Sequence, residues 1–381
     1  MEKTINRRQW LKTSAAAAVG LAAGFPHHGC RRRTPDPIEA PQAGRLIRLH
    51  LNESPYGLSP SARRAGAEAL ELAHQYPHKR YVELKQLIAS SENLPPDHII
   101  LGAGSTEIMT TLIHLHAAGK EAVVALPTYY DFIDYAERVD CRLRWVPLDA
   151  EFAHDLQAMA EELNSETGLV YICNPNNPTG SITPADKISA FIDLVSEKSL
   201  VIVDEAYHEY VEQSSYRSMV DHVRKKKNVM VMRTFSKIYG LAGMRVGYGL
   251  ARPDIIEKME RLERNFASIA YPSLMASQAA YRDRAFIARV KAMNKEARAY
   301  LCRELDRLGL FFVPSQTNFV LFRIDSDGEE MVKMFEEQGL LLRSLKFNGG
   351  DWLRVSLGEM KDMRTFVSLL SGILGSQFHS A

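Results

Sequence analysis

The stretch Leu200-Val201-Ile202-Val203-Asp204-Glu205-Ala206-Tyr207 decides the fold of this chain. Its first four residues are apolar without interruption, which predicts a strand that is covered on both faces, as in parallel sheets. Similar runs occur before it, at Leu169–Cys173, and after it, at Val229–Thr234, and the segment Asp186–Lys198 has the spacing of a helix. Strands that alternate with helices are typical of βαβ units. The sequence therefore predicts an α/β fold with a doubly wound, mostly parallel sheet.

The pattern changes after Pro272. A long helical stretch, Arg284–Leu308, is followed by short strands and a final helix, which predicts a smaller α+β domain. We expect four parts: residues 1–43 as signal peptide and linker, 44–75 as a segment contributing to the small domain, 76–272 as the large domain, and 273–381 as the small domain. The additional strands predicted are Ala122–Leu126, Leu143–Leu148, Val246–Leu250, Asn318–Arg323 and Trp352–Leu357.

Length and composition limit the classes of function. A chain of 381 residues can form one large and one smaller domain. The net charge of +1 provides no field that would attract nucleic acid, so nucleic acid is not expected as a partner. The four cysteines form neither a C-x-x-C pair nor a cluster with histidine at zinc-ligand spacing, so neither a disulfide framework nor a metal site is indicated.

The first residues have the layout of an export signal. The segment Asn6-Arg7-Arg8-Gln9-Trp10-Leu11-Lys12 resembles the bacterial twin-arginine signal, although Asn6 and Trp10 replace the usual Ser and Phe. The apolar run Ala15–Phe25 that follows is shorter than the roughly 20 residues of a membrane-spanning helix. We expect an exported, periplasmic protein without a stable membrane span in its mature form. A leader on a cytoplasmic protein is the alternative, and lipidation at Cys30 stays open.

Polar residues follow four predicted strands, at the edge where ligands gather in open α/β sheets. Gly102–Glu107 is glycine-rich and opens a helix, so its backbone amides can hold a phosphate. Asn174–Gly180 is a proline-restricted turn, and Asp204 ends a buried strand. Arg233–Arg245 brings a hydroxyl, an amine and a guanidinium into one glycine-punctuated loop. Each feature alone has a structural explanation as a turn or a helix cap, but their convergence predicts a single site.

These motifs resemble those of the fold-type I aminotransferases that depend on pyridoxal 5'-phosphate (PLP), and above all the histidinol-phosphate aminotransferase group. The resemblance runs from about Leu49 to Glu359. Its most specific parts are Asn174–Gly180, Asp204–Tyr207 and the Ser236-Lys237 pair with Arg245. It implies that the large domain binds PLP and that the reaction is amino-group transfer.

The resemblance also implies a role for each matching residue. Lys237 would form the Schiff base with PLP, which agrees with the reactivity of a lysine placed near other cations. Asp204 would pair with the pyridinium nitrogen and keep it protonated. Tyr129 would stack on the ring. The remaining implied contacts are hydrogen bonds from Asn177 and the catalytic Tyr207 to the phenolic oxygen, and contacts of Ser105, Thr106, Ser236 and Arg245 with the phosphate.

Substrate-binding residues follow from the same resemblance. Arg354 would bind the substrate carboxylate with two parallel hydrogen bonds, and Asn177 would also contact the substrate. Tyr56 and Arg343 match positions that line the substrate pocket, although each can equally be a surface or packing residue. Tyr76 matches a tyrosine that reaches the phosphate from the neighbouring subunit, which implies a homodimer with active sites at the interface. A buried core tyrosine is the competing interpretation.

We expect amino transfer between an amino acid, or an amino phosphate such as histidinol phosphate, and a 2-keto acid, by a ping-pong mechanism. Other PLP reactions on amino acids, catalysed by decarboxylases, lyases or oxidases, stay open because the same fold supports them. A PLP-dependent amino-acid sensor without catalysis is a further alternative. An export signal does not fit a cytosolic biosynthetic step, so the amino donor is left open.

Overall fold

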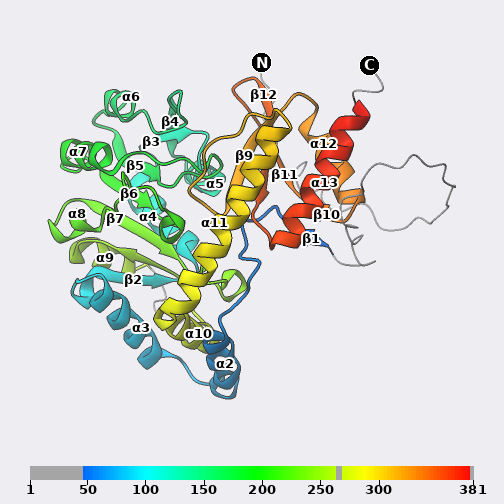
Figure 1. Ribbon diagram of the computed structural model, residues 1–381. Coiled ribbons are helices and arrows are strands. Elements are labelled where there is room, and N and C mark those ends of the chain that lie inside the picture. Colours follow the sequence, from blue (N-terminus) through cyan, green and yellow to red (C-terminus); the bar gives the residue numbers. More distant parts are fainter. Residues whose placement is uncertain (1–45, 263–267, 378–381) are drawn as a thin grey trace, which may run out of the picture. The chain divides into compact units, whose positions relative to one another are not determined.

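The computed structural model describes residues 46–262 and 268–377, so the predicted leader, its linker and Cys30 lie outside the described residues. A seven-stranded sheet with the order β2-β8-β7-β6-β5-β3-β4 occupies the centre of the large part (Figure 1). Strands β3 to β7 pair in parallel, whereas β8 is antiparallel to both β7 and β2. The predicted mostly parallel sheet is confirmed. Its strands are β2 (Ile99–Gly102), β3 (Glu121–Leu126), β4 (Arg142–Pro147), β5 (Thr167–Cys173), β6 (Leu200–Asp204), β7 (Val229–Thr234) and β8 (Gly247–Leu250).

Helices cover both faces of this sheet, as the continuous apolar strands require. In β6, Val201 and Val203 belong to one apolar cluster together with α7, and Leu200 and Ile202 belong to another together with α4. Figure 1 shows α7 and α8 on one side of the strands and α4 and α5 on the other. The covering helices are α4 (Ser105–Ala117), α5 (Tyr130–Arg138) and α9 (Pro253–Glu260) on one face, and α6 (Leu156–Glu161), α7 (Ala185–Val195) and α8 (Val220–Arg224) on the other.

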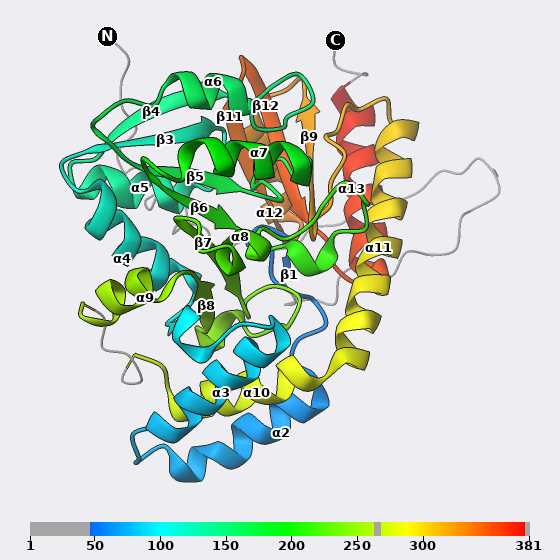
Figure 2. The same cartoon turned by 90° about the vertical axis from the view of Figure 1, so that its left-hand side faces the viewer.

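A second, smaller sheet forms the other part of the described chain. It has the order β11-β12-β9 and is antiparallel throughout. Its apolar face packs against α11, α12 and α13 in a separate core cluster. The long helix α11 runs past both sheets (Figure 2). The elements are α11 (Arg284–Arg307), β9 (Phe319–Ile324), α12 (Gly328–Glu337), β10 (Leu340–Leu341), β11 (Arg343–Phe347), β12 (Gly350–Ser356) and α13 (Met360–Gln377).

The N-terminal segment contacts two different regions. Strand β1 (Ile47–Arg48) pairs in parallel with β10, and α2 (Pro60–Glu68) packs against α10 (Tyr271–Arg282), which in turn contacts α3 (His78–Ser91). All of the described residues belong to one compact unit, so the predicted domain boundaries stay a prediction. Within the described part of the chain, no helix has both the length and the apolar character that a membrane span requires.

Candidate active site

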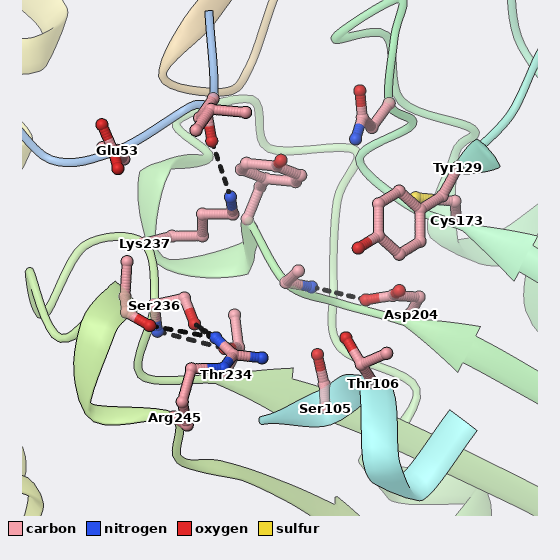
Figure 3. Close-up of a pocket in the computed structure, with 15 residues that line it drawn as sticks. Glu53, Ser105, Thr106, Tyr129, Cys173, Asp204, Thr234, Ser236, Lys237 and Arg245 are labelled. Carbon is pink, nitrogen blue, oxygen red and sulfur yellow. Dashed lines mark hydrogen bonds between the residues drawn. The ribbon is translucent and has the colours of Figure 1, made fainter. Parts of the chain in front are cut away.

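A cavity of about 230 Å³ lies at the carboxyl ends of three neighbouring strands, next to the start of α4 (Figure 3). The last residues of β5, β6 and β7 all line it, because parallel strands end at the same edge of a sheet. Polar residues from loops far apart in the sequence are therefore brought together. The predicted site residues that line the cavity are Ser105, Thr106, Tyr129, Asn177, Asp204, Tyr207, Ser236, Lys237 and Arg245, and the other lining residues are Leu51, Glu53, Cys173, Ala206, Thr234 and Ala242.

One side of the cavity carries hydrogen-bond donors and a guanidinium. Helix α4 begins at Ser105, so the backbone N–H groups of its first turn have no carbonyl partner within the helix. Arg245 Nη1 lies 3.4 Å from Ser236 Oγ. Gly104 has a φ of +82°, and a Cβ atom at this position would clash with the Arg245 guanidinium, so glycine is required. Free amides, a hydroxyl and a guanidinium together form a site suited to a phosphate.

A buried carboxylate forms another side of the cavity. Asp204 is 4% exposed, and its two oxygens accept hydrogen bonds from the Tyr171 hydroxyl at 2.9 Å and from the Ala206 N–H at 3.1 Å. Burial raises the pKa of Asp204 to about 6, and the Tyr171 hydrogen bond is the largest effect in the opposite direction. No ion pair of Asp204 is formed among the described residues. This carboxylate can therefore pair with a cationic group that enters the cavity.

The amine of Lys237 lies across the cavity from Asp204 (Figure 3). Its Nζ is 3.4 Å from the backbone carbonyl oxygens of Leu51 and Asn52, and 5.5 Å from the centre of the Tyr207 ring. Removal from water, followed by the positive charge of Arg354, lowers the pKa of Lys237 to about 8. A substantial fraction of this amine is neutral near pH 8. A neutral lysine amine is the form that attacks an aldehyde.

Arg354 lies in β12 and contacts Asn177 at the cavity. Arg354 is 4% exposed, and it donates from Nη1 to Asn177 Oδ1 at 2.6 Å and from Nη2 to the His50 carbonyl at 2.8 Å. Its Nε is buried and has no hydrogen-bond partner in the part of the chain that the structure describes. Burial is the main cause that lowers the pKa of Arg354 to about 10, and the charge of Arg343 acts in the same direction. A buried guanidinium with an unused donor is suited to an anion.

Four predicted residues do not line the cavity: Arg354, Tyr76, Tyr56 and Arg343. Tyr76 is 82% exposed, so its interpretation as a buried core tyrosine is wrong. Tyr56 lines a second cavity, which Arg63 and Glu359 also line, and it packs against the main core cluster. Arg343 lies directly opposite Arg354 in the β11–β12 register.

The residue range that matches a known family model covers most of the chain. Residues 45–370 match the model of the aminotransferase class I and II family. This chain belongs to that family. The resemblance seen in the sequence is confirmed, and the protein is a PLP-dependent aminotransferase with the fold-type I architecture.

Individual relatives of this aminotransferase agree with that assignment. It is 37% identical to the histidinol-phosphate aminotransferase of Moorella thermoacetica over 332 residues, which cover 86% of each chain. It is 34% identical to histidinol-phosphate aminotransferase 1 of Cupriavidus pinatubonensis, over 86% of this chain and 88% of the relative. The crystal structure of the histidinol-phosphate aminotransferase from Sinorhizobium meliloti, in complex with pyridoxal-5'-phosphate, is 28% identical and has a TM-score of 0.81, over 87% of this chain and 92% of that one.

The residues present in this aminotransferase fit PLP. The side of the cavity with Ser105, Ser236 and Arg245 offers donors to a phosphate, and Gly104 leaves room for the guanidinium. The opposite sides offer an amine for the aldehyde and, in Asp204, a buried carboxylate for the ring nitrogen. The chemistry and the arrangement of these groups therefore suit the phosphate, the aldehyde and the ring nitrogen of the cofactor. The role of each residue stays a prediction.

Sequence reasoning missed three contacts in this aminotransferase. The first is the Tyr171 hydroxyl on Asp204. The second is Asn52, which donates from Nδ2 to the Tyr207 hydroxyl at 3.0 Å. The third is Glu53, which lines the cavity and whose negative charge partly opposes the lowering of the Lys237 pKa. Asn52 and Glu53 lie within the range of the resemblance, which begins at about Leu49, but no feature of the sequence singled them out, and nothing pointed to Tyr171 because it lies inside a strand.

Proposed function

We propose that the protein transfers an amino group between a donor with an anionic end group and a 2-keto acid. The donor class includes amino acids and amino phosphates such as histidinol phosphate. The observation that carries this proposal is the unpartnered Nε of Arg354, buried beside Asn177. A buried donor without a partner costs free energy that a bound anion recovers. Arg343, which lies opposite Arg354 in the neighbouring strand, adds a second positive charge at this end.

Lys237 carries the proton transfer in this proposal. Bound PLP supplies an electron sink for the negative charge that develops at the substrate Cα. The Lys237 Nζ takes the proton from the substrate Cα and would deliver it to the cofactor carbon, since its lowered pKa lets it act as a base near neutral pH. Asp204 holds a positive charge at the ring nitrogen, and Tyr207 and Asn177 orient the phenolic oxygen. Ser105, Thr106, Ser236 and Arg245 hold the phosphate, and Tyr129 packs on the ring.

Product analysis tests the reaction and the donor. Holoprotein is incubated with single donors, among them histidinol phosphate and glutamate, with and without 2-oxoglutarate, and the amino acid and keto products are quantified. We expect turnover only when donor and keto acid are both present, with ping-pong kinetics. Release of carbon dioxide or ammonia without an acceptor would instead identify a decarboxylase, or a lyase or oxidase. Binding without multiple turnover would identify a sensor.

The substitution Arg354→Lys tests the anion site. Lysine keeps the charge but lacks the planar fork, so two parallel hydrogen bonds to a carboxylate or phosphate are lost. We expect KM for the donor and for the keto acid to rise by roughly 10- to 100-fold, because a charge-assisted pair is worth about 1.5 to 3 kcal/mol. Arg323→Lys, on the neighbouring strand β9, is the control. Equal KM values in both variants would contradict the proposal.

The protein is also proposed to act as a homodimer in which Tyr76 reaches the partner's phosphate site. The support is the exposure of this large aromatic side chain, 82%, away from its own cavity. Mixing subunits with Lys237→Ala and subunits with Tyr76→Ala tests the idea. If sites are shared, hybrid dimers contain one site with both residues intact, and activity recovers on mixing. Activity that stays at the sum of the two separate variants would exclude sharing.

We propose that the protein is exported, because of the sequence pattern of residues 1–43. These residues combine a twin-arginine-like segment with a short apolar run. A reporter protein fused to residues 1–43 should appear in the periplasm, and replacing Arg7 and Arg8 with lysine should retain it in the cytoplasm. Equal cytoplasmic retention of both fusions would favour the cytoplasmic alternative.

A further inference from the structure

The hydroxyl of Tyr171 reaches Asp204 from the neighbouring strand. In the register of β5 and β6, Cys173 lies opposite Asp204 and Tyr171 lies opposite Ile202. Side chains two residues apart in a strand point to the same face, so the Tyr171 side chain lies on the face of Cys173. Its hydroxyl donates to Asp204 Oδ2 at 2.9 Å. Strand pairing thus fixes the approach of this donor to the carboxylate.

Packing holds the Tyr171 ring in one place. Tyr171 is fully buried, and its ring stacks on that of Phe132 with 4.1 Å between the centroids and 16° between the planes. Phe132 lies in the first turn of α5, three residues after Tyr129, which lines the cavity. A hydroxyl on an immobilised ring is a preorganised donor. Its position costs no further ordering when a ligand binds.

The donors to Asp204 are neutral, and this bears on what the carboxylate can do. They are the Tyr171 hydroxyl and the Ala206 N–H, and the charged groups with the largest effect on Asp204 are Lys237 and Glu205. A guanidinium partner would compete with a cationic ring for the carboxylate. A neutral hydroxyl stabilises the carboxylate charge and leaves that charge available to the ligand.

We propose that Tyr171 is a positioning residue whose hydrogen bond to Asp204 keeps the proton shared between Asp204 and the PLP ring nitrogen on the nitrogen. The inference rests on the proposed pairing of Asp204 with that nitrogen. A protonated ring attracts electrons more strongly than a neutral one, and a proton that moves to the carboxylate weakens this attraction. The Tyr171 hydroxyl opposes that move because it bonds more strongly to a charged carboxylate than to a neutral one.

The test replaces Tyr171 with phenylalanine, which removes one oxygen and keeps the stacked ring. Holoprotein loaded with PLP that carries ¹⁵N in the ring reports directly where the proton lies. We expect the ¹⁵N signal of Tyr171→Phe to move from the position of a protonated towards that of an unprotonated pyridine nitrogen. We also expect kcat to fall about tenfold, with KM within about twofold, since a change of one pKa unit corresponds to a factor of ten.

Tyr216→Phe is the matched control, because the Tyr216 hydroxyl is buried but has no hydrogen-bond partner among the described residues. It should leave the ¹⁵N signal and kcat unchanged. If Tyr171→Phe does not fold, Phe132→Leu loosens the ring but keeps the hydroxyl, and the ¹⁵N signal should move in the same direction by less.

A ¹⁵N signal in Tyr171→Phe at the wild-type position would overturn the inference. Asp204→Asn separates this failure from a failure of the proposed function. If Asp204→Asn shifts the ¹⁵N signal and Tyr171→Phe does not, Asp204 pairs with the ring nitrogen but Tyr171 does not have the proposed role. If neither variant shifts it, the proposed pairing is wrong as well.

Discussion

Two buried carboxylates that are neighbours in the sequence belong to regions with different tasks. Asp204 is 4% exposed, lines the cavity and, among the described residues, accepts hydrogen bonds from neutral donors only. Glu205 is 1% exposed, and its partners are the Arg233 guanidinium at 3.0 Å, the Ser218 hydroxyl at 2.8 Å and the Met219 N–H at 2.7 Å. The carboxylate of Asp204 is suited to a cationic ligand, whereas the carboxylate of Glu205 is paired with a cation of the protein.

The difference between Asp204 and Glu205 shows that the cavity lowers the stability of the folded protein in exchange for a site that can bind a charge. A buried acid without an ion pair has a raised pKa, as Asp204 has, and its charged form destabilises the empty protein. Glu205 is instead paired with Arg233, which joins the end of β6 to β7. Arg233 also contacts Glu92 Oε1 at 2.7 Å, and Glu92 directly follows α3. The cavity is therefore preorganised for charge, and the neighbouring ion-pair cluster of Arg233, Glu205 and Glu92 maintains the scaffold.

Replacing Lys237 with alanine should have the largest effect on the cavity side. The amine provides both the covalent attachment and the proton transfer, so we expect kcat to fall by at least about 10⁴-fold, the upper range for general acid–base catalysis. Lys346→Ala, which removes an exposed lysine paired with Asp327, should keep full activity. Circular dichroism of both apoproteins should match the wild type. Substantial turnover by Lys237→Ala would refute the assignment of this lysine.

The pair Asp204→Asn and Glu205→Gln tests the comparison directly. Asp204→Asn should lower kcat by roughly 10² to 10³-fold, the usual cost of removing one preorganised electrostatic group. Glu205→Gln should keep the chemistry of the cavity but weaken the ion-pair cluster, so its main effect should be a lower free energy of unfolding. Both quantities are measured on both variants, and equal losses of activity would abolish the distinction.

The stability of the apoprotein should depend on pH because of Asp204. Its pKa in the folded state is about 6, above the ordinary 3.8, so between these values the folded protein binds more protons than the unfolded chain. Stability then falls as the pH rises through this window, and above pH 6 the charged carboxylate costs on the order of 3 kcal/mol. Apoprotein with Asp204→Asn should lose this dependence and be more stable than wild type at pH 8. Urea unfolding at pH 5 and pH 8 measures the difference.

Arg233→Met should lower the free energy of unfolding by disrupting the ion-pair cluster. It leaves Glu205 buried without its charged partner, which typically costs about 3 to 5 kcal/mol. Arg261→Met is the matched control, because Arg261 pairs with Glu257 at the surface, where an ion pair is worth at most about 1 kcal/mol. Chemical denaturation of the two variants measures the difference. Similar losses in both would mean that the ion-pair cluster does not stabilise the fold.

The sequence predicted best what depends on chain-local pattern. The structure places β6 and β7 at the predicted bounds, Leu200–Asp204 and Val229–Thr234, because continuous apolar runs mark strands that are buried on both faces. The sheet edge then brings the strand-end residues together without further information. β10, only two residues long, was not predicted as a strand. Such a short apolar run cannot be told from part of a helix.

What the sequence could not predict depends on register and on side-chain direction. The Tyr171 contact with Asp204 exists because β5 and β6 pair in one particular register, which no pattern within either strand encodes. The pairing of Glu205 with Arg233 likewise crosses strands. Tyr56 matched a motif, yet it lines the second cavity, because the path of a loop decides where its side chains point. The exposure of Tyr76 also required the folded structure.

The smallest expected effect concerns the balance of charge around Lys237. Its pKa is lowered to about 8, so the neutral fraction of the amine rises about tenfold per pH unit below pH 8 and levels off above it. The rate at which apoprotein binds PLP covalently, followed by stopped-flow absorbance, should have the same profile. Arg354 lowers the pKa of Lys237 and Glu53 raises it, so Arg354→Leu should move the midpoint to higher pH and Glu53→Gln to lower pH. The scaffold variant Glu205→Gln should leave the midpoint in place, since the charge of Glu205 is paired with Arg233. A midpoint that shifts in Glu205→Gln would mean that the two buried carboxylates share one electrostatic environment.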